Sequence, residues 1–404
     1  MSDKTPTFNK LTMLFLALYP ILGYYTGPAG LTYANIVTII LIVISFFKKP
    51  GISLNVYPKY YLIFWTYAAL ALIFTVSSMK ITFLIPGGIS FFLWSLALGL
   101  TLRYFDFSTL KKYLYLVFIL SSVVLIAQEV MIFFTGSRFI AFLPLSEELS
   151  IGANYSEWKQ VLLSANRSSS FFSEPSYFAL YSLPVLAIEL FYENDKKKVF
   201  TPLSFYIITV LLILRSGVGL IGIALLVFIK LVTFIKGINI KKILTFIVFF
   251  TIIIFVAKEY FSSKIGQEML ERTAEFDSES SSAYLRLIRG YLVYDYLPWF
   301  NKIFGIWPDD LLKMNIPYFD MTQNKSSILY FNGLQTALIR IGIIGVLILI
   351  TVYFNLYKNN TALAKVLIWT FLLLALLDQM YMSTTMLIFT SIADNIALGQ
   401  SNGT

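Results

Sequence analysis

The chain contains no cysteine and no histidine among its 404 residues. Without cysteine it forms no disulfide, has no thiolate metal ligand and has no cysteine nucleophile. Without histidine it lacks the side chain that most often moves protons near neutral pH and most often binds zinc. Any proton transfer must therefore use a carboxylate, a tyrosine, a lysine or water, and we expect neither a metal nor another cofactor.

Charged residues are also scarce, at 13%, whereas 58% of the residues are hydrophobic and the mean hydropathy is +0.76. This balance is typical of a membrane protein rather than a soluble enzyme with an anchor. Backbone groups in hydrocarbon must be bonded within a helix or a closed barrel, and the apolar runs lack the alternation of barrel strands. The sequence therefore predicts an all-α polytopic membrane protein with a single integral membrane domain over 1–404.

Eleven apolar runs approach the ~20 residues that a helix needs to cross the hydrocarbon. The tail, 384–398, is either a twelfth span or an external amphipathic segment, because Asp394 and Asn395 lie in its middle. We therefore predict 11 or 12 transmembrane helices. The eleven runs are 11–25, 29–47, 59–77, 82–101, 113–134, 176–192, 199–214, 218–235, 242–257, 328–354 and 362–381.

The connectors between these runs differ in positive charge. Short loops on one side carry only Lys80 and Arg215. Positive loops stay in the cytoplasm, so the N-terminus is predicted to be cytoplasmic. The same bias accounts for much of the net charge of +9, and we expect no nucleic-acid partner. The loops on the cytoplasmic side carry Lys4, Lys10, Lys48, Lys49, Lys59, Arg103, Lys111, Lys112, Lys196, Lys197, Lys198, Lys230, Lys236, Lys241, Lys242, Lys358 and Lys365.

Two connectors, 135–175 and 258–327, are long, and the predicted topology places both outside. Long loops are uncommon unless they carry function. In the second loop, 283–297 has the spacing of an amphipathic helix with Arg286 and Arg289 on a shared face. The alternative is an interfacial helix whose arginines face lipid headgroups.

Ionisable residues inside the predicted spans are costly and usually mark a pathway or a site. The candidates are Glu129, Glu189, Arg215, Arg340 and Asp378. All except Glu189 fall in the outer half of the predicted membrane, which favours a polar cavity open to the exterior. The alternative is that each one snorkels or pairs locally, for example Arg340 with Asp378.

A serine-rich motif, 166–178, precedes the sixth predicted span. Pro175 suits the first helical position, and Ser173 and Glu174 occupy the positions of a cap. The free amides at this helix start, with Arg167 nearby, predict an environment that attracts anions. A second outward cation, Arg215, lies in the abrupt turn between the seventh and eighth spans.

Four local patterns, in this order along 166–350, resemble the Wzy-type polysaccharide repeat-unit polymerases, which are related in architecture to O-antigen ligases. The ligases rely on a histidine in the large loop, which this sequence lacks, so the polymerases are the better match. The patterns are Arg…Phe-x-Glu-Pro-Ser-x-Phe from Arg167 to Phe178, the turn Arg215-Ser216-Gly217, an arginine-containing helix leading to Phe304-Gly305, and Asn332-Gly333 with Gly342-Ile343-Ile344-Gly345 around Arg340.

The resemblance implies a metal-independent glycosyltransferase of the bacterial cytoplasmic (inner) membrane, with its active site facing the periplasm or exterior. Its substrates would be a donor and an acceptor linked to undecaprenyl diphosphate within the membrane lipid. Chain-length control in such systems usually needs a regulator protein, and the product would be O-antigen, capsule or exopolysaccharide.

Guanidinium groups neutralise the charge that develops on a departing lipid diphosphate. We therefore predict that Arg215 and Arg289 contact the diphosphate, with Arg167, Arg286 and Arg340 as further candidates. Glu174 is the candidate catalytic base for the acceptor hydroxyl. A helix N-terminus beside a guanidinium stabilises the ionised carboxylate and weakens it as a base, so the alternative is that Glu174 orients Arg167.

Two other function classes compete with the polymerase. One is a flippase for lipid-linked oligosaccharides or another transporter, although flippases of this span count have short loops on both faces. The other is a ligase that attaches glycan to lipid or protein and differs only in its acceptor. Asp309-Asp310 is the nearest approach to a Mg²⁺ site, and it is better explained as a solvated pair.

Overall fold

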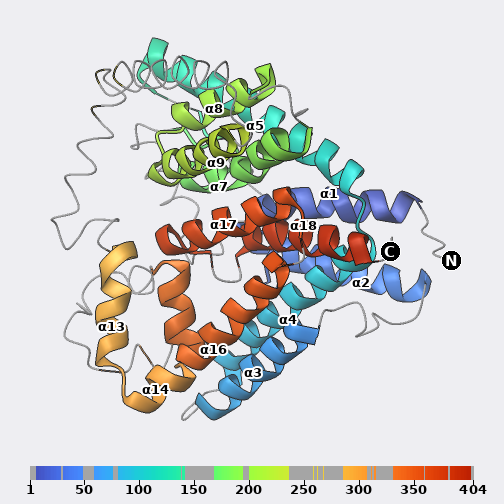
Figure 1. Ribbon diagram of the computed structural model, residues 1–404, viewed down its shortest axis with the longest axis vertical. Coiled ribbons are helices and arrows are strands. Elements are labelled where there is room, and N and C mark those ends of the chain that lie inside the picture. The colour runs from blue at the N-terminus through green and yellow to red at the C-terminus, as the bar shows by residue number, and fades with distance from the viewer. Residues whose placement is uncertain are drawn as a thin grey trace. The chain divides into compact units, whose positions relative to one another are not determined.

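The computed structural model describes residues 6–28, 31–48, 59–75, 81–137, 139–141, 168–193, 200–235, 285–306, 331–358, 360–380 and 383–401, with single residues at 258, 262, 267, 311 and 314. Within these ranges every regular element is a helix, and the strand-like pairing is one isolated bridge between Thr26 and Thr32. The predicted all-α class is confirmed for this part of the chain (Figure 1).

Each predicted apolar run corresponds to a helix, except 242–257, which lies outside the described residues. The tail also forms a helix. The helices are α1 Pro6–Leu22, α2 Tyr33–Lys48, α3 Lys59–Thr75, α4 Ile81–Arg103, α5 Phe107–Thr135, α7 Pro175–Ile188, η3 Glu189–Glu193 (a π-helix), α8 Pro202–Ile213, α9 Gly217–Ile235, η5 Leu285–Arg289 (a π-helix), α13 Gly290–Tyr296, α14 Trp299–Phe304, α16 Gly333–Lys358, α17 Ala362–Leu377 and α18 Thr384–Ser401.

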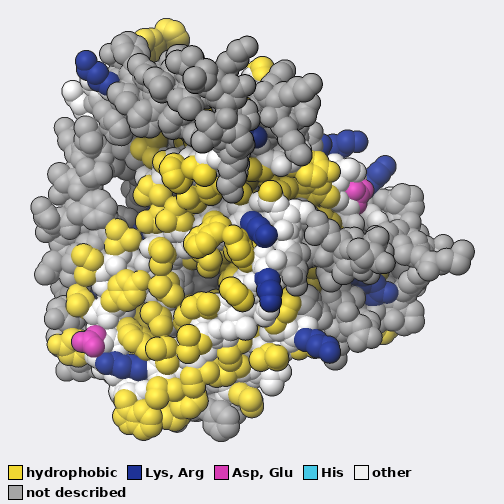
Figure 2. Space-filling view, in the orientation of Figure 1, with side chains coloured by type: hydrophobic (Ala, Val, Ile, Leu, Met, Phe, Trp, Pro, Cys, Tyr) yellow, Lys and Arg dark blue, Asp and Glu magenta, His cyan; other side chains and the backbone are white. Residues whose placement is uncertain are grey.

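Three helices are long and apolar enough to cross a membrane by length and composition: α5, α9 over Gly217–Phe234, and α16. Large apolar side chains on them are exposed, including Phe133 at 83% and Phe228 at 65%. Hydrophobic side chains also cover much of the visible face in Figure 2. Such surfaces are unfavourable in water and indicate association with a membrane.

The chain divides into two compact units. The terminal unit comprises 1–117, 143–164 and 285–404, and the central unit comprises 118–142 and 165–284. Helix α5 therefore begins in the terminal unit and continues into the central unit.

In the terminal unit, α16 packs against α3, α14 and α17, while α18 packs against α1, α4 and α17. Polar side chains in this apolar interior bond one another, as required when water is excluded. The hydroxyls of Thr101 and Ser391 lie 2.8 Å apart, and those of Ser45 and Tyr104 also lie 2.8 Å apart. These bonds join α4 to α18 and α2 to the end of α4.

In the central unit, α7 is the buried element, since every residue from Phe178 to Ile188 is buried. It packs against α8 and α9. Two glycines of α9, Gly219 and Gly222, face Ala179 and Leu183 of α7, and a Cβ on Gly222 would collide with Leu183. Small residues thus let the two helices approach closely.

Helix α16 is broken at Gly342, whose φ of 64° and ψ of −177° are not helical. Figure 1 shows the two segments of α16, 333–341 and 343–358, running in different directions beside α14. The run 328–354, predicted as one continuous span, therefore contains two helical segments. The prediction failed because the residues on both sides of Gly342 are apolar, so hydropathy does not show that the backbone changes direction there.

The break is held by the backbone that follows α14. Gly305, with φ of 94°, packs against the carbonyl of Arg340, and Gly342 packs against the carbonyl of Ile303. Ile306 N donates to the Ile339 carbonyl at 2.7 Å. We call this contact between 303–306 and 339–342 the glycine clasp.

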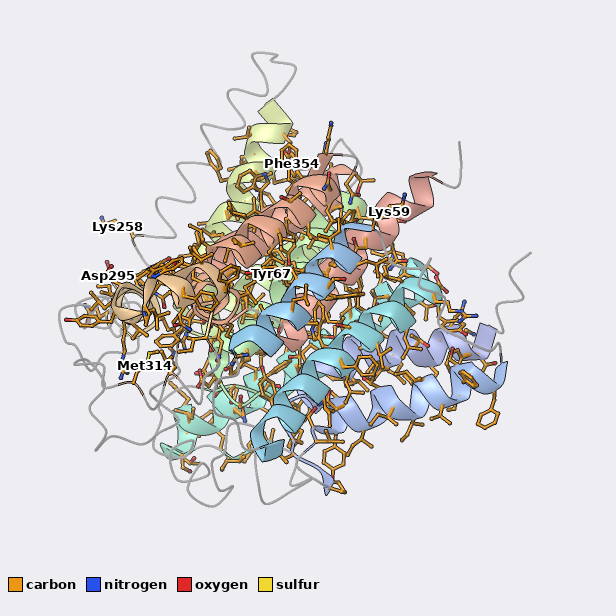
Figure 3. The ribbon with its side chains drawn as sticks, turned by 90° about the horizontal axis from the view of Figure 1, so that it is seen from below. Lys59, Tyr67, Lys258, Asp295, Met314 and Phe354 are labelled. Atoms are coloured by element: carbon orange, nitrogen blue, oxygen red, sulfur yellow. The ribbon has the colours of Figure 1, made fainter. Side chains whose placement is uncertain are left out.

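Tyr67 of α3, labelled in Figure 3, makes a hydrogen bond at the break. Its hydroxyl donates to the Ile341 carbonyl at 2.8 Å, one residue before the break. The break thus lies beside the middle of α3, and the carbonyls of Ile339 and Ile341 next to it are bonded within the protein.

Candidate functional site

The serine-rich loop 168–174 of the central unit packs against α5. Ser170 has a positive φ of 57°, its N–H donates to Gln128 Oε1 at 2.9 Å, and its hydroxyl donates to the Ser121 carbonyl at 2.6 Å. Phe172 is fully buried and stacks on Phe178 of α7, with ring centroids 5.0 Å apart. The loop is therefore anchored at Ser170 and at Phe172.

The anchor lies deep along α5. Ser121 precedes Thr135, the end of α5, by enough residues to lie ~20 Å from that end at 1.5 Å per residue. Non-helical backbone beside the middle of a helix long enough to span a membrane must be enclosed by protein or line a polar space. The buried Ser168 and Ser173 hydroxyls have no hydrogen-bond partner among the described residues, so this loop supplies polar groups to its surroundings.

Helix α7 begins at Pro175, as the sequence predicts. Glu174 is the N-cap, with an extended backbone, but its side chain makes no capping bond to a backbone amide. Its carboxylate instead accepts a hydrogen bond from the Ser176 hydroxyl at 3.1 Å. The negative charge still lies at a helix N-terminus, where it is favoured. Arg167, its predicted partner, lies outside the described residues.

Arg215 forms an ion pair with Glu129. Arg215 Nη2 lies 2.9 Å from Glu129 Oε2, and the two side chains are only 12% and 19% exposed. Charge-assisted hydrogen bonds of this kind are strong and fix a guanidinium in position. Both residues were candidates from the sequence, but their pairing across 86 positions was not predicted.

The backbone of Arg215 is strained. Its φ is 50°, in the left-handed region that costs a residue other than glycine about 1–2 kcal/mol. It lies in the turn between α8 and α9, where glycine or asparagine would be the ordinary choice. The fold therefore tolerates a cost in order to keep an arginine at this turn, a pattern typical of functional positions.

The terminal unit contains a second ion pair, between Arg286 and Asp378. Arg286 Nη1 lies 3.2 Å from Asp378 Oδ2, and the Asp378 side chain is 1% exposed. Asp378 Oδ1 also accepts from Gln379 N at 2.7 Å. The sequence suggested Arg340 as the local partner of Asp378, and this suggestion is wrong. Arg340 is exposed and precedes the break at Gly342 by two residues.

Asn332 ties three segments together at this ion pair. Its Nδ2 donates to the Arg286 carbonyl at 2.8 Å and to the Leu376 carbonyl at 2.9 Å. The start of α16, the end of α17 and the π-helix η5 are thereby fixed to one another. No pattern of charge or hydropathy indicated this role for Asn332, although an Asn-Gly pair before an apolar run does indicate a structured helix start.

The segment 283–297, predicted as one amphipathic helix, is a π-helix over Leu285–Arg289 followed by α13. Arg289 at their junction is buried, with 8% exposure. The next residue, Gly290, packs so closely on α16 that a Cβ would collide with Gln335. Arg286 and Arg289 are therefore held on a packed element rather than on a free loop.

The predicted arginines fall into the two units. Arg215 belongs to the central unit, and Arg286, Arg289 and Arg340 belong to the terminal unit. A single guanidinium-lined pocket that combines them stays a prediction. Among the described residues, no group of three or more acidic side chains could hold a metal, and Asp309 and Asp310 lie outside them.

Comparisons with known proteins found no matching family model, no similar curated protein and no similar solved structure.

Replacing Asp378 by alanine is expected to lower the free energy of unfolding by about 3–5 kcal/mol, because Arg286 would keep a buried charge without its carboxylate. Thermal unfolding in detergent, followed by tryptophan fluorescence, measures the change. The double variant Arg286→Met/Asp378→Leu should recover most of the loss, since a buried pair can be replaced by apolar groups at little cost. Equal unfolding temperatures for Asp378→Ala and the natural protein would contradict the pairing.

Proposed function

We propose that this chain is a polytopic protein of the bacterial cytoplasmic membrane, with a cytoplasmic N-terminus, that polymerises polysaccharide repeat units at the outer face. It transfers a glycan from one undecaprenyl diphosphate carrier to the sugar end of another lipid-linked repeat unit. The apolar helices and the asymmetric loop charges support the membrane topology. The resemblance to the Wzy-type polymerases supplies the reaction class.

The observation that carries the proposal is the Arg215–Glu129 ion pair at a strained turn of apolar helices. A guanidinium is planar, always charged and shaped to bind two phosphate oxygens at once. Because Arg215 is largely withdrawn from solvent and Glu129 fixes it, it is preorganised toward charge that develops on a leaving diphosphate. Preorganised charge of this kind acts without a metal ion.

A second centre supports the same chemistry. Arg286 and Arg289 lie on one turn of η5, and Asp378 and Asn332 fix that turn. The predicted topology puts this turn on the outer side, as it does Arg215. A donor and an acceptor each carry a diphosphate, and a guanidinium held in this way suits the binding of such a group.

In the proposed reaction, an acceptor hydroxyl attacks the anomeric carbon of the donor sugar. The new glycosidic C–O bond forms as the bond to the diphosphate breaks, and undecaprenyl diphosphate leaves with the electron pair. The hydroxyl proton passes to a carboxylate, for which Glu174 at the start of α7 is the candidate.

The decisive assay incubates the purified protein in detergent with lipid-linked repeat units and separates the products by size. Detergent removes the two compartments, so transport has no meaning there. A polymerase yields a ladder of lipid-linked chains. A flippase or another transporter yields none, and a ligase yields product only when its own lipid or protein acceptor is added, so either result would refute the proposal.

A further inference from the structure

Helix α18 of the terminal unit carries a fully buried carboxyl group. The Asp394 side chain has 0% exposure, and Asp394 is the one charged residue in the sequence of α18. It lies ten residues along α18, ~15 Å from the start of that helix. It is therefore distinct from the Arg286–Asp378 pair, and the mechanism proposed above does not use it.

The surroundings of Asp394 are tyrosines at the start of α3. The Tyr60 hydroxyl donates to Asp394 Oδ1 at 3.4 Å. Tyr61 is 3% exposed, and its hydroxyl lies close enough to Asp394 to interact with it electrostatically and as a hydrogen-bond partner. Tyr60 and Tyr61 thus bring two neutral hydroxyls, but no positive charge, to the buried carboxyl group.

No counter-charge compensates Asp394 within the described residues. The helices that pack against α18 or supply its tyrosines carry few cations, and none forms an ion pair with this carboxyl. An isolated buried carboxylate costs far more than a buried ion pair, so such groups neutralise instead. The cations on those helices are Lys10, Lys59, Arg103, Arg340, Lys358 and Lys365, and the other tyrosines are Tyr19, Tyr67, Tyr353 and Tyr357.

We propose that Asp394, Tyr60 and Tyr61 form a proton-binding site in the interior of the terminal unit. One proton, taken from water, converts the carboxylate into a carboxylic acid. The acid donates from Oδ2 to the Tyr61 oxygen, while Tyr60 donates to Oδ1. A single bound proton therefore removes the buried charge, which hydrogen bonds from neutral tyrosines to an ionised carboxylate would leave in place. The protonated site joins α3 to α18, and loss of the proton would separate them. This inference does not depend on the proposed function.

Infrared spectroscopy tests the proposal without an activity assay. At neutral pH the natural protein should show the carbonyl stretching band of a protonated carboxyl group, and Asp394→Asn should lose it. The matched control is Asp106→Asn. Asp106 lies outside the predicted spans, and hydrogen bonds from Thr109 and then Ser108 hold its pKa below the usual range. It is ionised, so its replacement should leave the band unchanged. A band equally strong in Asp394→Asn would overturn the proposal.

A second variant keeps the test decisive if Asp394→Asn does not fold. Tyr61→Phe removes the proposed acceptor but leaves the carboxyl group, so the band should persist and move toward the position of an acid without a hydrogen bond. A band that does not move would refute the Tyr61 contact. Absence of the band from the natural protein, with stabilisation by sodium but not choline chloride, would show a metal cation in place of the proton.

Discussion

Arg215→Ala is expected to stop chain growth and leave single repeat units on their lipid carrier. The reason is electrostatic: removing one preorganised donor from a developing anion typically costs about 10²–10³-fold in rate. Glu129 holds the Arg215 guanidinium in position at 2.9 Å. The backbone of Arg215 has a φ that disfavours arginine, which is typical of a functional position. The measurement is the ladder of products formed by equal amounts of the variant and the natural protein, each purified in detergent and shown to be folded.

The control must separate lost chemistry from lost structure, because Arg215→Ala leaves Glu129 without its cation. The double variant Arg215→Gly/Glu129→Gln removes both charges and gives the turn a residue that adopts a φ of 50° without strain. It should fold at least as well as the natural protein and still form no polymer. Normal chain lengths in either variant would refute the role assigned to Arg215.

Gly342→Ala is expected to have the largest effect on folding. At a φ of 64° and ψ of −177° any side chain is strained, and a Cβ would collide with the Ile303 carbonyl across the glycine clasp. Backbone strain and a rigid collision together should cost more than about 4 kcal/mol, which exceeds most single substitutions. The yield of folded protein and its unfolding temperature in detergent measure the loss.

Gly136→Ala is the matched control. Gly136 also has a positive φ, 68°, but no atom lies within 4 Å of a Cβ placed there. The free energy of unfolding of Gly136→Ala should fall only by the cost of placing alanine at a positive φ, about 1 kcal/mol. Gly305→Ala should match Gly342→Ala, and the double variant should be no worse than either, because both disrupt one contact. Similar unfolding temperatures for Gly136→Ala and Gly342→Ala would show that the clasp contributes little.

The sequence alone determined the elements that depend on local composition. The long apolar runs predicted the helices, because the hydropathy of a run is the sum of the preferences of its own residues for water or an apolar environment. Pro175 marked the start of α7, because a missing N–H has no cost at the first helical position. The absence of histidine and cysteine limits the chemistry to carboxylates, hydroxyls and cations, whatever the fold.

Tertiary structure decided which of these groups meet. Asp378 pairs with Arg286, 92 residues away, and not with Arg340 in the neighbouring run. The break in α16 needs glycine at position 342 because the backbone of Ile303 and Phe304 occupies the space that a side chain would need. Asp394 is buried against α3 through a contact that spans 334 positions. Hydropathy is a property of single residues, whereas pairing and strain depend on where distant backbone segments come to lie, so only the folded chain could supply them.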